Sequence, residues 1–322
     1  MQESGTMTSP KDGPRHEAYE RLIETTRRLS PTPTVVAHPC DTVSLEGALE
    51  ARASGIIEPL LVGPRSRIEA AAAELGRSLK GLEIVDTPHS HASAAEAVKL
   101  IRAGRGELLM KGSLHTDELM AEVTHRDTGL RTERRISHVF AMAVPTYAQP
   151  LFITDAAVNI FPDLDAKRDI VQNAIDLAIA LQLEAKVAIL SAVETVTSKI
   201  PSTIDAAALC KMADRGQITG GLLEGPLALD NAISPEAARI KGIVSPVAGQ
   251  ANILVVPDLE AGNMLAKNLT FLANADAAGV VLGARVPIML TSRADALRAR
   301  MASAALAVLF AEYRKANQPV AS

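Results

Sequence analysis

Short apolar runs alternate with longer segments of helical spacing through the first part of the chain. Apolar runs of this length predict strands, and segments in which apolar side chains recur every three or four positions predict helices. The expected strands are 34–39, 56–62, 82–85 and 108–111, and the expected helices are 16–29, 45–53, 65–75 and 91–102. Because strands that alternate with helices are typical of βαβ units, this pattern predicts a parallel sheet covered by helices.

The pattern changes where two apolar runs follow each other without a helix between them. These runs, 137–144 and 151–157, are separated by a short segment with Pro145 and Pro150 at its ends. Strands so close in sequence are joined most easily as an antiparallel pair. We therefore expect an antiparallel pair here and the entry to a second α/β region.

The alternation of strands and helices resumes beyond residue 160. Ile170, Ala174, Ala178 and Leu181 share one face of a helix that we expect over 164–181. The remaining expected elements are two strands in the central stretch 187–234, a strand at 252–256, a helix at 262–272, paired strands at 279–282 and 286–290, and a helix at 295–314.

Length and composition limit the classes of protein to which the chain can belong. With 322 residues, it exceeds the size at which a single core usually stops growing, so two domains are expected. A net charge of −4 gives no basic field for nucleic acid, and 2% aromatic residues without Trp argue against base-stacking platforms. No uncharged apolar stretch reaches the ~18 residues of a membrane span. We expect neither a nucleic acid nor a membrane as partner.

The N-terminal residues and the cysteines bear on the compartment. Residues 1–14 are polar and lack an apolar core, so they predict a disordered leader rather than a signal peptide. Cys40 and Cys210 are the only cysteines, and their spacing predicts neither a metal site nor a disulfide framework. We expect both to be structural thiols in a reducing, cytoplasmic environment.

The central stretch carries the strongest signals for function. Its first apolar run ends in small polar residues, and Ser198 and Lys199 stand just before a Pro-Ser-Thr helix start. Its second apolar run ends at Glu224, with Asp230 and Asn231 just beyond. Strand ends that open into helix N-termini bind anions readily, because the backbone N–H groups there are unpaired. Helix capping with solvated charges is the alternative interpretation of the same residues.

Two other expected strand ends are followed by groups that can contact an anion. Lys111 ends one apolar run and His115 follows it, although a lone His after a strand also serves as a structural donor. Ser292 and Arg293 follow another apolar run. Asp295 stands at the next helix start, where a carboxylate also stabilises the helix dipole.

Ordered motifs over most of the chain resemble those of the phosphate acetyltransferase and phosphate butyryltransferase family. Several motifs in the same order identify a family more safely than one short motif does. They are KGSLHT (111–116), GLRT (129–132), SHV (137–139), FITDAA (152–157), AVE (192–194), KIP (199–201), GPLALDNAIS (225–234), PDLEAGN (257–263) and TSRAD (291–295).

The resemblance implies a fold and a reaction. The fold is two α/β domains with parallel-type sheets and a cleft between them, the isocitrate-dehydrogenase-like architecture, with residues 15–140 and 292–322 in one domain and 141–291 in the other. The reaction is short-chain acyl-CoA + phosphate ⇌ acyl phosphate + CoA, by direct transfer in a ternary complex. It implies CoA as a substrate, no cofactor and no metal. It also implies a homodimer, for which the apolar strands near Val280 to Leu290 are the candidate interface.

The resemblance also assigns roles to residues. Ser292 and Arg293 match a Ser-Arg pair that contacts the reacting groups, and Asp295 is the nearest carboxylate. The residues expected to bind phosphate or acyl-CoA are Lys111, His115, Ser198, Lys199, Glu224, Asp230 and Asn231.

Two positions depart from the acetyl-type enzymes of that family. Those enzymes carry an Asp, the proposed base for the CoA thiol, where this chain has Ala299, and an Arg where it has Glu122. Small residues after Ser292 would also leave room for extra methylenes. These departures favour the butyryl-type branch and predict that butyryl- or propionyl-CoA outperforms acetyl-CoA.

Two other functions fit part of the pattern. A nicotinamide-dependent hydroxy-acid dehydrogenase of related architecture is one, but the chain has no G-x-G-x-x-G after an expected strand. A non-catalytic acyl-CoA sensor on the same fold is the other, and Ala299 at the position of the base keeps it open. Turnover of acyl phosphate separates the sensor from the enzyme.

Overall fold

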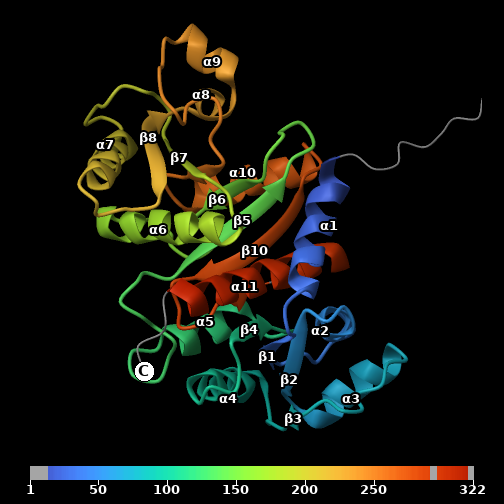
Figure 1. Cartoon of the computed structure of the whole chain (residues 1–322). Helices are drawn as coiled ribbons and strands as arrows, with labels where there is room; N and C mark the ends of the chain where they lie inside the picture. Colours follow the sequence, from blue (N-terminus) through green and yellow to red (C-terminus); the bar gives the residue numbers. More distant parts are fainter. Residues whose placement is uncertain (1–13, 291–295, 318–322) are drawn as a thin grey trace, which may run out of the picture.

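The computed structural model describes residues 14–290 and 296–317, which form one sheet of eleven strands covered by helices. The strand order is β3-β2-β1-β4-β11-β10-β5-β6-β9-β7-β8. Figure 1 shows the sheet running from the first half of the chain, at the bottom of the view, into the second half at the top.

The first half forms the parallel βαβ layer that the sequence predicts. Strand β1 lies between β2 and β4, and β3 extends the sheet beyond β2, all parallel. Its elements are α1 (Pro14–Arg27), β1 (Thr32–Ala37), α2 (Thr42–Ala53), β2 (Ile57–Val62), α3 (Arg65–Glu74), β3 (Ile84–Val85), α4 (Ser90–Arg102), β4 (Leu108–Lys111) and α5 (Thr116–Thr124).

Three strands link the two halves. They are β5 (Ser137–Ala143), β10 (Asp276–Leu282) and β11 (Ile288–Met289). β5 and β10 pair antiparallel along their whole length, from Ser137 opposite Leu282 to Ala143 opposite Asp276. β11 is antiparallel to β10 and parallel to β4. The expected antiparallel pair is confirmed, because β6 (Leu151–Thr154) lies antiparallel on the other side of β5.

The second half adds a parallel group, in which β6, β9, β7 and β8 follow one another. Asp163 and Asp258 start two of its helices, because each carboxylate accepts a hydrogen bond from the third backbone N–H beyond it. The elements are α6 (Leu164–Ala180), β7 (Ala185–Leu190), α7 (Pro201–Asp214), β8 (Gly221–Leu227), α8 (Leu229–Ile233), α9 (Pro235–Ile240), β9 (Ile253–Val255), α10 (Leu259–Phe271) and α11 (Leu297–Asn317).

The two faces of the sheet are covered differently. One face carries a single apolar cluster to which α1, α2, α3, α6, α7 and α11 contribute, and Figure 1 shows α11 and α6 lying across it. The other face carries two separate clusters, one under α4 and α5 and one under α8 and α10. On the central strand β5, Val139 packs into the first face, so by alternation His138 points to the face that is divided.

Two strands end earlier than expected, each for a local reason. β1 stops at Ala37 because His38 has a positive φ of 57°, which turns the chain out of the strand. β6 stops at Thr154 because the Asp155 carboxylate accepts hydrogen bonds from the backbone N–H groups of Ala157 and Val158, which closes a turn.

The structure also bears on the larger-scale expectations. β11, which falls in the predicted second domain, is hydrogen-bonded to β4 of the first, so the boundary near residue 291 stays a prediction. The predicted interface near Val280 to Leu290 is wrong, because β10 and β11 lie inside the sheet and Val280 is fully buried. The predicted leader lies outside the described residues except for Pro14, which begins α1.

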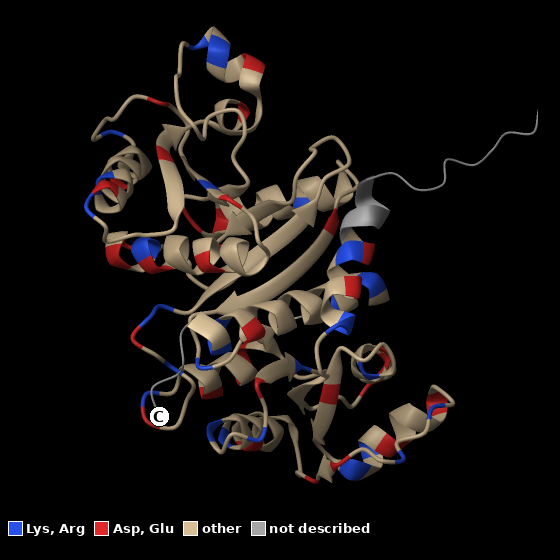
Figure 2. Ribbon diagram, viewed as in Figure 1, with Lys and Arg blue, Asp and Glu red and all other residues tan. Residues whose placement is uncertain are grey.

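Charge and hydropathy of the folded chain agree with its ordinary composition. In the view of Figure 2, Lys and Arg alternate with Asp and Glu on both halves of the molecule. Among the described residues, no helix is both long enough and apolar enough to cross a membrane.

Candidate functional site

The end of β4 places Lys111 and His115 at one loop. Lys111 is buried, and its ammonium donates hydrogen bonds of 3.2 Å to the backbone oxygens of Gly112 and Leu114. His115 is exposed at the start of α5. The loop therefore holds one buried cation and presents one imidazole to solvent.

The same loop is locked to the end of β1. The hydroxyl of Ser113 donates to the backbone oxygen of His38 at 2.8 Å, and the backbone N–H of Ser113 donates to the same oxygen at 2.8 Å. A side chain on Gly112 would collide with the backbone oxygens of Ala37 and His38. Only glycine fits this close approach, so the loop position is set by backbone contacts.

The strand that precedes the segment predicted to contact the reacting groups, β11, lies beside β4. Met289 of β11 pairs with Met110 of β4, so the chain leaves β11 next to the end of β4. Ser292, Arg293 and Asp295 lie outside the described residues.

A second group of predicted residues lies on β8 and just beyond it. The expected strand end at Glu224 is wrong, because β8 continues to Leu227, and Asp230 and Asn231 follow it in α8. Asn231 is fully buried and its amide donates to the Glu194 carboxylate, which also forms a 2.8 Å ion pair with Lys241. Asp230 is exposed and accepts from the backbone N–H of Asn231 at 2.9 Å. Glu224 is half-buried and accepts from the backbone N–H that follows it at 3.0 Å.

The loop before α7 brings Ser198 and Lys199 into the same region. Both are exposed. The loop is fixed by Thr203, whose hydroxyl accepts from the backbone N–H of Thr197 at 2.9 Å and donates to its backbone oxygen at 2.8 Å. Pro201 begins the helix, as the sequence predicts.

These two groups follow strands in different halves of the sheet. β4 and β7 are six steps apart in the strand order, which at about 4.8 Å per strand corresponds to roughly 29 Å along the sheet. Lys111 and Asn231 thus belong to opposite halves of the sheet. One site made of all seven predicted binding residues stays a prediction.

A polar pocket of about 670 Å³ lies between the loop that leads into β5 and the start of α6. Sequence reasoning assigned no role to its residues. The available signal was the density of arginines just before the predicted strand at 137–144. The pocket is lined by Thr124, Arg131, Thr132, Glu133, Arg134, Arg135, Ile136, Val158, Asn159, Asp163, Asp165, Ala166, Arg168 and Asp169.

Buried polar groups stand behind this pocket. Asp155 is 3% exposed and His138 is 2% exposed. Burial lowers the pKa of His138 to about 4, against the opposing charge of Asp155. His138 is therefore a neutral imidazole at physiological pH. It is buried on the face of the sheet that carries two separate apolar clusters.

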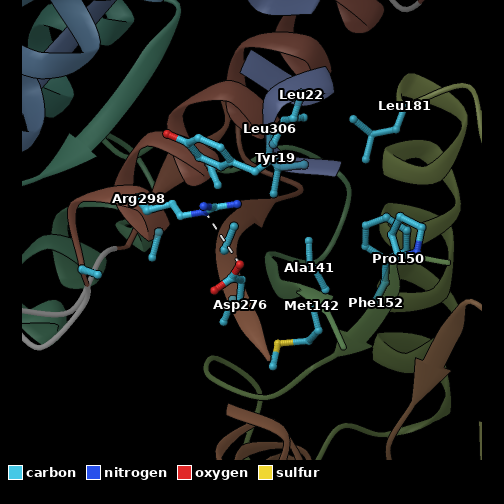
Figure 3. Close-up of a pocket in the computed structure, with 16 residues that line it drawn as sticks. Tyr19, Leu22, Ala141, Met142, Pro150, Phe152, Leu181, Asp276, Arg298 and Leu306 are labelled. Atoms are coloured by element: carbon cyan, nitrogen blue, oxygen red, sulfur yellow. Dashed lines mark ion pairs between the residues drawn. The ribbon is translucent and has the colours of Figure 1, made fainter. Parts of the chain in front are cut away.

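An apolar pocket of about 210 Å³ lies between α1, α11 and the ends of β5 and β10 (Figure 3). Ala299, which stands where the acetyl-type enzymes carry their proposed base, lines it together with Met142 and Phe152. Arg298 lies 4.3 Å from the Tyr19 ring centre and 3.7 Å from the Asp276 carboxylate. The helix face after residue 295 thus borders an apolar space with a charged rim.

Neither cysteine is poised for nucleophilic chemistry. Burial raises the pKa of Cys40 to about 11 and that of Cys210 to about 12. Both stay protonated thiols at physiological pH, which agrees with the structural role expected for them. Within residues 14–290 and 296–317, no group of three or more His, Cys, Asp or Glu side chains is placed to hold a metal ion.

Comparison with known sequences gives consistent matches. A family model described as "Phosphate acetyl/butaryl transferase" matches residues 90–308. The chain is 71% identical to a phosphate acetyltransferase of Rhizobium meliloti over 94% of this chain and 96% of the relative. It is 54% identical to a phosphate acetyltransferase of Rickettsia felis (97% and 92%) and 39% identical to a phosphate butyryltransferase of Clostridium acetobutylicum (92% and 98%). These identities do not support the predicted closeness to the butyryl-type branch.

Solved structures confirm the predicted fold class. A branched-chain phosphotransacylase from Enterococcus faecalis is 30% identical, with a TM-score of 0.75 over 86% of this chain and 98% of that one. A phosphotransacetylase from Streptococcus pyogenes has a TM-score of 0.80 at 22% identity, over 91% and 98%. A 4-hydroxythreonine-4-phosphate dehydrogenase from Burkholderia phymatum shares the fold more loosely, with a TM-score of 0.53 at 13% identity over 87% and 99%.

Proposed function

The chain belongs to the phosphate acetyl/butyryl transferase family and is an acyltransferase, and from this we propose that it catalyses acetyl-CoA + phosphate ⇌ acetyl phosphate + CoA. The observation that carries the choice of acetyl is the 71% identity, over nearly the whole chain, to a relative named phosphate acetyltransferase. Relatives named for butyryl transfer are 39% to 43% identical. The predicted preference for butyryl- or propionyl-CoA has no support from these relatives.

We propose direct transfer without a covalent enzyme intermediate. A phosphate oxygen attacks the thioester carbonyl carbon, the carbon–sulfur bond breaks, and the proton that the attacking hydrogen phosphate loses is taken up by the CoA thiolate. The reaction needs an anion site and donors for the oxyanion that forms in the transition state. Arg293 and Ser292 are proposed for these roles because they match the Ser-Arg pair of the family, and they follow β11, which pairs with the strand that ends at Lys111.

A group other than residue 299 must exchange a proton with the CoA thiol. Ala299 lines an apolar pocket and has no ionisable group. Asp295 is the nearest carboxylate in sequence to the proposed Ser-Arg pair. A thiol of pKa ~8.5 is already partly ionised at neutral pH, so a neighbouring Arg that lowers this pKa further supplies much of the required help.

Release of CoA from acetyl-, propionyl- and butyryl-CoA, with and without phosphate, tests the proposed reaction. We expect phosphate-dependent release that is fastest with acetyl-CoA. Tight acyl-CoA binding without turnover would instead identify a sensor on the same fold. A higher specificity constant for butyryl-CoA than for acetyl-CoA would contradict the proposal of acetyl transfer and support the butyryl-type activity.

We also propose the assembly and division implied by the family resemblance. The chain is proposed to act as a homodimer, which a mass measurement by light scattering checks against the 33.9 kDa chain. The division at residues 140/141 and 291/292 is proposed for the two α/β domains. β11 is the element that this division separates from its partner β4.

A further inference from the structure

The polar pocket contains an arginine, Arg135, whose guanidinium is oriented by a hydrogen bond to a neighbouring side chain. The Nε of Arg135 donates a 2.7 Å hydrogen bond to the side-chain oxygen of Asn159. Both residues line the pocket. A guanidinium held through Nε keeps its two terminal amino groups free to form the fork that binds a phosphate or a carboxylate.

The orientation of Asn159 is itself fixed. Asn159 is 4% exposed, and its amide nitrogen donates to the Asp155 carboxylate at 2.6 Å and to the backbone oxygen of Ile136 at 2.9 Å. These two acceptors require the nitrogen on their side, so the side-chain oxygen must face Arg135. Asp155 is fixed in turn, because it also accepts from three backbone N–H groups of the turn that follows it.

Two of the four arginines that line the pocket form ion pairs, and two form none with the described residues. Arg134 forms a 2.8 Å ion pair with Asp176, and Arg168 forms a 3.0 Å ion pair with Asp169. Arg131 and Arg135 form no ion pair with any residue in the described part of the chain, although both lie in the pocket.

The four acidic residues of the lining equal its four arginines in number, but their contacts lie elsewhere than the guanidinium groups of Arg131 and Arg135. Asp163 caps α6, and Asp169 accepts from the backbone N–H of Arg135 at 2.9 Å in addition to its ion pair. Asp165 lies 3.7 Å from Arg168, and Glu133 is exposed. Within the described part of the chain, the guanidinium groups that remain without an ion pair are therefore those of Arg131 and Arg135.

We infer that this pocket binds the phosphate-bearing half of CoA, with Arg135 as the anchor and with Asp155 and Asn159 as its positioning residues. The inference rests on the proposed function. Its new element is the location of the anion site, which is separate from the predicted residues on β8 and just beyond it.

The length of α5 matches the length of the pantetheine arm of CoA. α5 begins just after His115 and ends at Thr124, which lines the pocket. Its nine residues span about 13.5 Å at 1.5 Å per residue. The pantetheine arm has about thirteen bonds from sulfur to phosphorus, equal to a little over four residues of extended backbone, or ~15 Å. CoA phosphates in the pocket therefore allow the thioester to reach the loop that holds Lys111.

Calorimetric titration of the purified full chain with CoA and with pantetheine tests the site. Arg135→Gln should weaken CoA binding by about tenfold or more and leave pantetheine binding unchanged, because a lost charge-assisted bond costs about 1.5–3 kcal/mol. The matched control is Arg126→Gln, which removes the same charge from an exposed residue of the preceding turn that does not line the pocket. Equal CoA affinity in Arg135→Gln and wild type would overturn the inference.

Asn159→Ala tests the positioning role separately. We expect the ratio of CoA affinity to pantetheine affinity to fall by about threefold, roughly half the free energy of one charge-assisted bond. A general loss of packing would lower both affinities together and leave the ratio unchanged, which would count against positioning. Arg135→Lys should recover little, since an ammonium cannot donate to Asn159 and form the fork at once.

Inorganic phosphate as a second probe distinguishes the two sources of a phosphate group. Arg135→Gln should leave the Michaelis constant for phosphate unchanged while raising that for acetyl-CoA. The reverse result would assign the pocket to the inorganic substrate and overturn the inference. If the wild type binds CoA but turns over no acyl-CoA, the proposed function fails while the site stands.

Discussion

Arg293 is the side chain to which the proposed chemistry assigns the phosphate. Arg293→Ala should raise the Michaelis constant for phosphate and lower kcat, with a combined loss of about 2–4 kcal/mol if the contact is desolvated. Steady-state kinetics with phosphate as the varied substrate measure this. Arg285→Ala is the control, because Arg285 is an exposed arginine that precedes β11. Near wild-type kinetics in Arg293→Ala would move the anion site elsewhere.

Ala299 offers a second test at single-residue scale. In Ala299→Asp, a carboxylate would enter an apolar pocket that already contains Asp276. Burial without a dedicated partner costs about 1–3 kcal/mol, so we expect a lower melting temperature and no gain in kcat. Thermal unfolding and the CoA-release assay check both parts. An unchanged melting temperature with several-fold faster turnover would show that this position can still serve a base.

His138 predicts how stability depends on pH. Its pKa is about 4 in the folded chain, lowered mainly by burial, against 6.5 for an unperturbed His. Between these values the unfolded chain binds more protons, so stability is complete above pH 6.5 and falls as the pH drops towards 4, by about 3 kcal/mol in all.

Denaturant unfolding from pH 7 to pH 4.5 measures that slope. His138→Gln should flatten it relative to wild type, because the carboxylates that titrate in the same range are common to both proteins. Identical slopes in the two proteins would contradict the assignment to His138.

At the scale of elements, the close approach of β1 and β4 decides where Lys111 lies. Gly112→Ala would force the two strand ends apart, and overpacking of this kind costs typically about 1–3 kcal/mol. We expect lower stability and a larger fractional loss of activity, since the loop carries Lys111. Gly47→Ala in α2 is the control, because its added methyl group meets only side-chain atoms, those of Arg300 and the end of Met110. Equal effects of the two substitutions would mean that the strand ends can yield.

The elements that could be predicted are those whose signal is local. The predicted bounds of strand β4 are the observed ones, and those of helix α6 agree within one residue. Apolar periodicity and helix caps depend on residues that are close in the sequence. The ends of β1 and β6 were missed because they depend on the backbone angle of His38 and on the acceptors of Asp155. Short helices such as α8 have too few residues to show a period.

The candidate site was less predictable, because it depends on contacts between residues that are far apart in the sequence. Lys111 stands at a strand end and Asn231 just beyond one, as expected, but their separation depends on the order of strands in the sheet. Strand order cannot be read from hydrophobic spacing. The pair of Arg135 with Asn159 joins residues that β5 and β6 separate in the sequence, so only the folded chain shows it.

At the scale of the whole molecule, the sheet predicts that a chain truncated after residue 275 will not fold. Such a chain would lack β10, β11 and α11, which leaves β4 and β5 with open edges and uncovers the cluster on one face. We expect an insoluble product, and sedimentation of expressed material checks it. A soluble, cooperatively folded fragment would show that the first half needs no partner from the end of the chain.

The pairing of β5 with β10 also has a consequence for synthesis of the protein in the cell. β5 ends at residue 143, and its partner begins at residue 276, so more than a hundred residues must leave the ribosome before the pair can form. At about 5–20 residues per second, this is a wait on the order of 7–27 seconds with strand edges unprotected. We therefore expect the nascent chain to bind holdase chaperones during this wait, and codons that slow translation between residues 143 and 276 should lower the yield of folded enzyme.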